Sequence, residues 1–395
     1  MKLTKGLMSK IEKIFSRLDP DKEFEIETGE LKVGDEVVTV FFPRDDVRVS
    51  VKYLLKYLDD LEFLEFNVSK VSSPRFTQMP VYCSGKPLEL LISEIDFVTK
   101  INGAFTIRLV EHPLLIGIAA TKLGIWDKFA LPCSAYIAVE VQYDSDKVRL
   151  SPEEELKTIR SYLFELSNLC GASVDFNVIH ESGAFDEYEE PVTKHVTWTS
   201  LTSFSEGMDL FRKAINSEDQ EIAFLYFYKI IEYYSPIAAK ATSYEVLLKK
   251  IEALKSRDVT STDLSAIFMI ADKYRNALSD RYLSPTLLSH AVDIVELFSL
   301  LPNDVQKGIT KTVHFNKADL NYHTSPEIIQ GIFNQVGAIL YSTRNSIVHA
   351  KSNYRSDGLE CTPDDLPTIN VFLKAACYSV IRWNSRLPAH LKFDE

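Results

Sequence analysis

The spacing of hydrophobic residues changes about halfway along the chain. Between Val33 and Tyr143, short runs rich in β-branched and aromatic residues are separated by turn-forming pairs, Ser84-Gly85 and Asn102-Gly103. These runs predict strands at Glu36–Phe42, Leu88–Val98, Ala104–Val110 and Ala135–Tyr143. After about residue 203 the apolar positions recur every three or four residues, which is the period of a helix.

A helix start stands between these two patterns. Ser151 can cap a helix, Pro152 suits the first helical position, and Glu154 can complete a capping box, so we expect a helix from there to about Cys170. A strand near 173–179 should follow. The segment 181–190 then holds five acidic residues in ten, which is typical of a solvated linker, and we expect the domain boundary between it and residue 203.

Several sequence signals predict helix starts in the second half. Ser217 and Gln220 have the spacing of a capping box, and Ser-Pro or Thr-Pro pairs recur at residues 284, 325 and 362. The expected helices cover about 218–234, 243–256, 262–278, 286–300, 326–349 and 364–386. The sequence therefore predicts an α+β protein, with a β-rich domain over residues 1–200 and an all-helical domain over residues 201–395.

Composition and charge exclude several classes of function. The net charge is −12, and −10 of it falls in the first 200 residues, so any contact with nucleic acid must use a local patch. The five cysteines show no CxxC spacing, which argues against a zinc knuckle or a disulfide framework and favours the cytoplasm. The most apolar stretch, which begins at Leu114, is too short to span a membrane. The motifs GxxxxGK[ST], GxGxxG, HExxH and GxSxG are absent.

The most informative segment is the predicted helix over 326–349. Its apolar residues keep a spacing of three and four, so one face should pack in the core. The last turns carry Arg344, Asn345 and His349, all off that face. Asn345 and His349 share one side of the helix, whereas Arg344 and His349 are separated by about 140° around a straight helix.

Residues 344–349 match the R-N-x-x-x-H motif of HEPN domains, which are helical modules that act as metal-independent ribonucleases in many toxin, abortive-infection and CRISPR-associated proteins. The aromatic-rich stretch Tyr226–Tyr234 is similar to the first helix of HEPN domains fused behind large N-terminal domains in phage-defence proteins. The resemblance covers about residues 205–390. It implies a homodimer in which two copies of the motif form one cleft, an RNA substrate, and no metal or cofactor.

The chemistry of these residue types fits the resemblance. Cleavage of RNA without a metal requires a group that moves protons near neutral pH and a cation that stabilises the developing phosphorane. His349 suits the first role and Arg344 the second, while Asn345 would orient either the histidine or the phosphate. Tyr341, one turn earlier, would line the same cleft, and Glu232 in the aromatic-rich helix would pair with Arg344 or another cation.

Two interpretations remain open at this point. In the first, the helical domain is an endoribonuclease regulated by an N-terminal domain that senses an unknown trigger in antiviral defence. In the second, it is a non-catalytic scaffold for dimerisation or nucleotide binding, and the N-terminal domain performs the function. Arg344, Asn345 and His349 near a helix C-terminus would then cap carbonyl groups and complement the helix dipole.

Overall fold

The computed structural model divides the chain into two units, Met1–Ser203 and Phe204–Glu395. The domain boundary expected from the sequence stood at residue 200. The structure describes residues 9, 13, 25–28, 37–58, 60–83, 95–101, 104–127, 130–144, 149–179, 194–198, 200–255, 258–277, 280–349 and 358–392.

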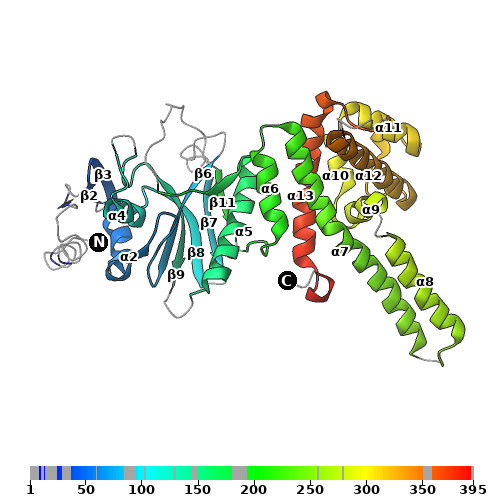
Figure 1. Ribbon diagram of the computed structural model, residues 1–395, viewed down its shortest axis with the longest axis horizontal. Coiled ribbons are helices and arrows are strands. Elements are labelled where there is room, and N and C mark those ends of the chain that lie inside the picture. The colour runs from blue at the N-terminus through cyan, green and yellow to red at the C-terminus, as the bar shows by residue number, and fades with distance from the viewer. Residues whose placement is uncertain are drawn as a thin grey trace. The chain divides into compact units, whose positions relative to one another are not determined.

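The described residues of the first unit form two sheets (Figure 1). A three-stranded antiparallel sheet consists of β1 (Glu25–Thr28), β2 (Val37–Phe42) and β3 (Asp45–Ser50). The strands of the second sheet are β4 (Glu65–Phe66), β5 (Val71–Ser72), β6 (Phe76–Cys83), β7 (Ile95–Ile101), β8 (Phe105–Glu111), β9 (Ile137–Tyr143), β10 (Val174–Phe176) and β11 (Lys194–Trp198). Their order is β11-β7-β8-β9-β6-β5-β4, and β10 also pairs with β6. The β11–β7 pair is parallel, whereas the other described pairs are antiparallel.

Both faces of the larger sheet are covered near β9. Helix α5 (Pro152–Cys170) contributes Ile159 and Tyr162 to a core with Val139 and Val141 of β9. Ala138 belongs to a second core because successive strand residues point to opposite faces. That core joins the smaller sheet with α2 (Val51–Tyr57), the 3₁₀ turn Leu61–Phe63 and α4 (Leu114–Leu123).

Most predicted elements of the first unit are confirmed. Helix α5 begins and ends as expected, and its capping box between Ser151 and Glu154 is present. The predicted strands correspond to β2, β8 and β9, the run near 173–179 contains the shorter β10, and the run at 88–98 is described only from Ile95. The pairs at 84–85 and 102–103 and the acidic segment 181–190 lie outside the described residues. Helices α2 and α4 were not predicted, and neither were strands β1, β3, β4, β5, β6 and β11.

The described residues of the second unit form helices and turns, as the sequence predicted. The α-helices are α6 (Glu206–Asn216), α7 (Gln220–Leu254), α8 (Ser261–Ala277), α9 (Asp280–Ala291), α10 (Ile294–Leu297), α11 (Asn303–Val313), α12 (Pro326–His349) and α13 (Leu366–Arg386). The 3₁₀ turns are Phe298–Leu300, Lys317–Asp319, Pro363–Asp365 and Ala389–Leu391. Side chains of α7, α12 and α13 are buried in this unit, among them Phe224, Val336 and Phe372.

The predicted starts of two helices are wrong, and so is the predicted interruption between the helices expected over 218–234 and 243–256. Asp219, not Ser217, caps α7, because its carboxylate accepts hydrogen bonds from two backbone amides of the first turn. Helix α7 continues through Pro236 to Leu254, since the residues on both sides of the proline are buried and tertiary packing outweighs the lost backbone hydrogen bond. Helix α9 begins five residues before Pro285, and the predicted helix 286–300 is divided into α9, α10 and a 3₁₀ turn.

Pro285 has a packing role inside α9. A Cβ atom added to Gly337 of α12 would lie 2.6 Å from Cγ of Pro285, so the glycine lets the two helices approach closely. Helix α12 itself runs over 326–349 as predicted. Its expected apolar face is largely buried, with Ile332, Phe333, Val336 and Leu340 in the core. This packing places the last turns of α12 beside α7.

Candidate functional site

Arg344 and Glu232 meet between α12 and α7. The Nη2 atom of Arg344 lies 3.7 Å from Oε1 of Glu232, and its Nη1 atom donates a hydrogen bond of 3.1 Å to Oδ1 of Asn345. The Arg344 side chain is 33% exposed and that of Glu232 is 41% exposed. The structure therefore brings together three of the five residues singled out in the sequence.

A pocket of about 260 Å³ opens at this pair. Its walls combine charged and apolar groups from two helices. Its lining residues are Ile222, Leu225, Tyr226, Tyr228, Lys229, Glu232, Arg344 and Val348. Ile222 and Val348 are about half exposed, so the apolar part of the pocket continues onto the surface.

Lys229 places a second cation in the pocket. Its Nζ atom lies 5.6 Å from the centre of the Tyr226 ring, which is within the range of a cation–π interaction. With Arg344 and Glu232, the pocket holds two cationic side chains and one carboxylate. A local excess of positive charge is the kind of patch that an acidic chain would need to bind a phosphate.

His349 is the last residue of α12, and its side chain lies outside the described residues. The helix runs unbroken from Arg344 to His349, so an early helix end does not bring the two residues together. Within one chain, convergence of the two side chains therefore requires the long arginine side chain to turn toward the histidine.

The other candidate residues have different surroundings. Tyr341 is half-buried in α12 and is not among the residues that line the pocket. Of the aromatic residues in the first part of α7, Phe227 and Tyr234 are core residues, whereas Tyr226 lines the pocket. The Tyr234 hydroxyl donates a 2.6 Å hydrogen bond to Ser205, and burial raises the pKa of this tyrosine.

The first unit contains a polar cluster around Glu140 that sequence reasoning missed. Glu140 is fully buried on β9 and lies opposite Arg108 of β8 and Gln78 of β6 in the sheet register. Arg108 donates hydrogen bonds of 3.0 and 2.7 Å to one carboxylate oxygen. The other oxygen accepts from Gln78 at 2.8 Å and from the hydroxyl of Tyr57. The signal in the sequence was a charged residue in the middle of an apolar strand.

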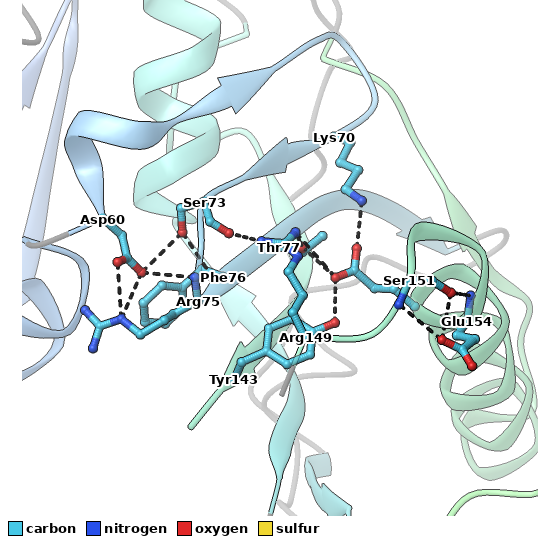
Figure 2. Close-up of polar contacts among 11 residues, drawn as sticks. Asp60, Lys70, Ser73, Arg75, Phe76, Thr77, Tyr143, Arg149, Ser151 and Glu154 are labelled. Atoms are coloured by element: carbon cyan, nitrogen blue, oxygen red, sulfur yellow. Dashed lines mark hydrogen bonds and ion pairs between the residues drawn. The ribbon is translucent and has the colours of Figure 1, made fainter. Parts of the chain in front are cut away.

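A second buried carboxylate, that of Glu155, lies at the start of α5. It accepts hydrogen bonds from Lys70 at 2.7 Å, Thr77 at 2.9 Å and Tyr143 at 2.6 Å. Figure 2 shows these three residues converging, with Arg149 beside them. Burial, and then the hydrogen bond to Glu155, raises the pKa of Tyr143. Because its oxygens accept hydrogen bonds from several protein donors, this carboxylate holds the start of α5 to the strands of the larger sheet.

Another pocket of about 450 Å³ lies beside α9 and α10. Its lining includes His290, whose pKa is lowered by burial, and Tyr322. The Tyr322 hydroxyl lies 2.9 Å from Glu296 and 3.0 Å from Asp293. Hydrogen bonds to Glu296 and then to Asp293 raise the pKa of Tyr322 to about 12. None of the candidate residues from the sequence lines this pocket.

Searches for metal ligands and membrane spans give negative results over the part of the chain that the structure describes. No group of three or more His, Cys, Asp or Glu side chains there is arranged to hold a metal ion. Among the same residues, no helix combines the length and the apolar character needed to cross a membrane.

Comparison with models of protein families gives a match in the second unit. The sequence model of a family described as methylamine utilization protein MauJ matches residues 208–378, which lie within the second unit. The matched segment contains α7 and α12, and so it includes the pocket at Arg344. Searches of curated proteins and of solved structures gave no match for this chain.

Proposed function

We propose that the second unit is a metal-independent endoribonuclease of the HEPN type. The observation that carries the proposal is the position of Arg344: the first residue of the R-N-x-x-x-H motif lines a pocket together with Lys229 and Glu232. A planar guanidinium that is one third exposed can exchange a weak protein contact at 3.7 Å for two hydrogen bonds to a phosphate.

The proposed reaction uses the RNA as its own nucleophile. His349 takes the proton from the ribose 2′-hydroxyl, whose oxygen attacks the adjacent phosphorus as the bond to the 5′-oxygen of the next nucleotide breaks. The leaving 5′-oxygen takes a proton from water, and His349 returns its proton to the solvent. Arg344 stabilises the negative charge on the phosphorane, and Asn345 orients the Arg344 guanidinium through the 3.1 Å hydrogen bond. The products are a 2′,3′-cyclic phosphate and a 5′-hydroxyl. DNA lacks the nucleophile and should be spared.

The active form in this proposal is a homodimer. The exposed apolar residues Ile222 and Val348 lie at the pocket, where a second copy could cover them and supply a second motif. The second copy would bring its own His349 toward Arg344. The two residues that act together would then come from different chains, so their separation around one helix would not matter. The first unit would sense the trigger that releases this activity, in keeping with the resemblance to phage-defence proteins.

One observation favours the alternative, in which the second unit is a scaffold without catalytic activity. Glu232 opposes the charge of Arg344, and Asn345 accepts one of its hydrogen bonds, so the guanidinium already has partners in the free protein. A role in joining α7 to α12 would use the same contacts. The family description MauJ names methylamine utilization and states no reaction, so it does not choose between the two.

Cleavage of a labelled RNA by the purified full chain tests the proposal. Arg344→Ala and His349→Ala should each lower the cleavage rate by about 10²-fold or more, the usual effect of removing a charge-stabilising group or a general base. Cleavage should persist in EDTA, because the proposed nucleophile is not a metal-bound water. The cyclic phosphate is identified by mass spectrometry of the products.

Matched variants control for folding and for general charge effects. Arg382→Ala removes an exposed arginine of α13 whose Nη1 contacts Tyr378, and His323→Ala removes an exposed histidine; both should cleave at the wild-type rate. Wild-type cleavage by both motif variants would contradict the nuclease assignment at these residues and leave the scaffold. Equal cleavage of the matching DNA would contradict attack by the 2′-hydroxyl.

A further inference from the structure

The C-terminal part of α7 and the antiparallel α8 form a helical hairpin that projects from the rest of the second unit (Figure 1). This hairpin carries an unusual concentration of exposed large hydrophobic residues. They are Tyr244, Val246, Leu248, Ile251, Val259, Leu264, Phe268 and Met269. Phe268 is 70% exposed and Met269 is 72% exposed.

The seam between the two helices uses other residues. Leu247 and Leu254 of α7 and Ile270 of α8 are only partly exposed, which places them toward the partner helix. Lys250 reaches across the seam to Asp263, with 2.8 Å between Nζ and Oδ1. The exposed hydrophobic residues are therefore not needed to hold the hairpin together.

Helical geometry divides the exposed residues between two faces. Successive residues turn by about 100°, so Tyr244, Leu248 and Ile251 lie together, about 100° from the seam of α7. Leu264 and Phe268 lie a similar angle from the seam of α8. The two helices are antiparallel. Seen from one end of the hairpin, successive residues therefore advance clockwise around one helix and anticlockwise around the other. For this reason the two groups of exposed residues lie on the same side of the hairpin.

We name this side face A and define it by Tyr244, Leu248, Ile251, Leu264 and Phe268. The Lys250–Asp263 pair sets the register, which puts Ile251 within about one helical turn of the level of Leu264 and Leu248 within about one turn of the level of Phe268. By the same geometry Val246 and Met269 lie on the opposite side, which we name face B. The wheel places two charged residues on face A, which are Lys255 at the tip of the hairpin and Arg275 near the C-terminal end of α8.

We propose that face A pairs with face A of a second copy, so that two hairpins form an antiparallel four-helix bundle. Two helices are half of such a bundle, and a two-fold axis supplies the missing half with a surface that is apolar at the same positions. The central residues of the face are uncharged, so two copies do not bring like charges together there.

The area of face A agrees with pairing of two copies. From the exposed fractions of its five side chains, the face presents roughly 450 Å² of apolar surface, within the range of about 300–600 Å² that the largest apolar patch of a monomer covers. A stable interface takes about 800 Å² from each partner. The polar residues that flank face A along α8, a helix about 25 Å long, supply the remainder.

This pairing is independent of the proposed nuclease. It uses α7 and α8 beyond Tyr244, whereas the proposed catalytic dimer uses Ile222 and Val348 at the pocket. A chain that pairs through both surfaces would assemble into four copies or into a longer array. Loss of one contact should therefore leave the other intact.

Light scattering on the full chain at micromolar concentration tests the proposal. The wild type should have a mass of at least twice 44.9 kDa, and Leu264→Lys with Phe268→Lys should halve that mass. The matched control is Val246→Lys with Met269→Lys on face B, which adds the same charge to the same hairpin and should leave the mass unchanged. All four side chains are exposed, so the circular dichroism melting temperature should stay at the wild-type value.

Three results would overturn the pairing. A monomeric wild type would exclude it, and so would an unchanged mass in the face A variant. Dissociation by the face B variant alone would assign the contact to the other side of the hairpin. A halved mass in the face A variant with retained RNA cleavage would support the pairing and separate it from the catalytic dimer.

Discussion

Glu140 in the first unit and Glu232 in the second are both paired with an arginine, in very different surroundings. Glu140 is fully buried, and its two oxygens accept hydrogen bonds from Arg108, Gln78 and Tyr57. Glu232 is 41% exposed and approaches Arg344 at 3.7 Å beside an open pocket. The same pair of charges is thus saturated in one unit and loosely held in the other.

The difference separates a contact that holds a fold from one that can take a ligand. A buried carboxylate with all its donors in place cannot exchange them without leaving charges and polar groups unpaired. A half-exposed pair gains little from its partner, because water screens the attraction and already hydrates both groups. We therefore expect Glu140 to stabilise the fold of the first unit and Arg344 to bind a ligand.

The largest expected effect is that of Glu140→Ala. It leaves the Arg108 guanidinium and the Gln78 amide without their acceptor, and should destabilise the first unit by about 3–5 kcal/mol. Hydrogen exchange followed by mass spectrometry reports this as faster exchange in peptides from β6, β8 and β9. Gln142→Ala, two residues along the same face, is the control and should cost less. Wild-type protection after Glu140→Ala would contradict the comparison.

Ile339→Ala and Arg344→Ala compare the core face of α12 with its pocket face. Ile339 is buried, so truncation leaves a cavity and should lower the free energy of unfolding of the second unit by about 2–5 kcal/mol. Arg344→Ala should cost less than about 1 kcal/mol. Urea unfolding measures both. An equally large loss for Arg344→Ala would show that the arginine is a structural residue.

The buried tyrosines predict a loss of stability at alkaline pH. Burial, and then the charge of Glu140, raises the pKa of Tyr57, and burial likewise raises that of Tyr143. Above pH 10 the unfolded chain loses these protons while the folded chain keeps them, so stability should fall by about 1.4 kcal/mol per tyrosine for each pH unit. Urea midpoints between pH 8 and pH 11 measure the slope. Tyr143→Phe should make it shallower, and an unchanged slope would speak against this cause.

The smallest expected effect is that of Glu232→Ala. An exposed ion pair contributes about 0–1 kcal/mol, and the contribution should vanish in 1 M salt because the charges are screened. A double-mutant cycle of Glu232→Ala and Arg344→Ala at low and high salt measures the coupling. Coupling of several kcal/mol that persists in high salt would make this pair resemble the one at Glu140.

The predictions from the sequence succeeded where the signal was local. The capping box at Ser151 and the Ser-Pro start at Ser325 set the first turns of α5 and α12, because those hydrogen bonds lie within a few residues. The apolar face of α12 followed from its spacing. The start of α9 was wrong because Pro285 is held inside the helix by its contact with Gly337, a residue distant in the chain.

The candidate site shows the same limit. The sequence alone determined that Arg344 and Asn345 lie off the core face of α12, since helical periodicity decides which residues a helix buries. The tertiary structure decided that Glu232 and Lys229 of α7 share a pocket with Arg344, and that Glu140 is buried among its donors. These placements depend on how distant elements pack, and a packing arrangement is a property of the whole unit that no short stretch of sequence contains.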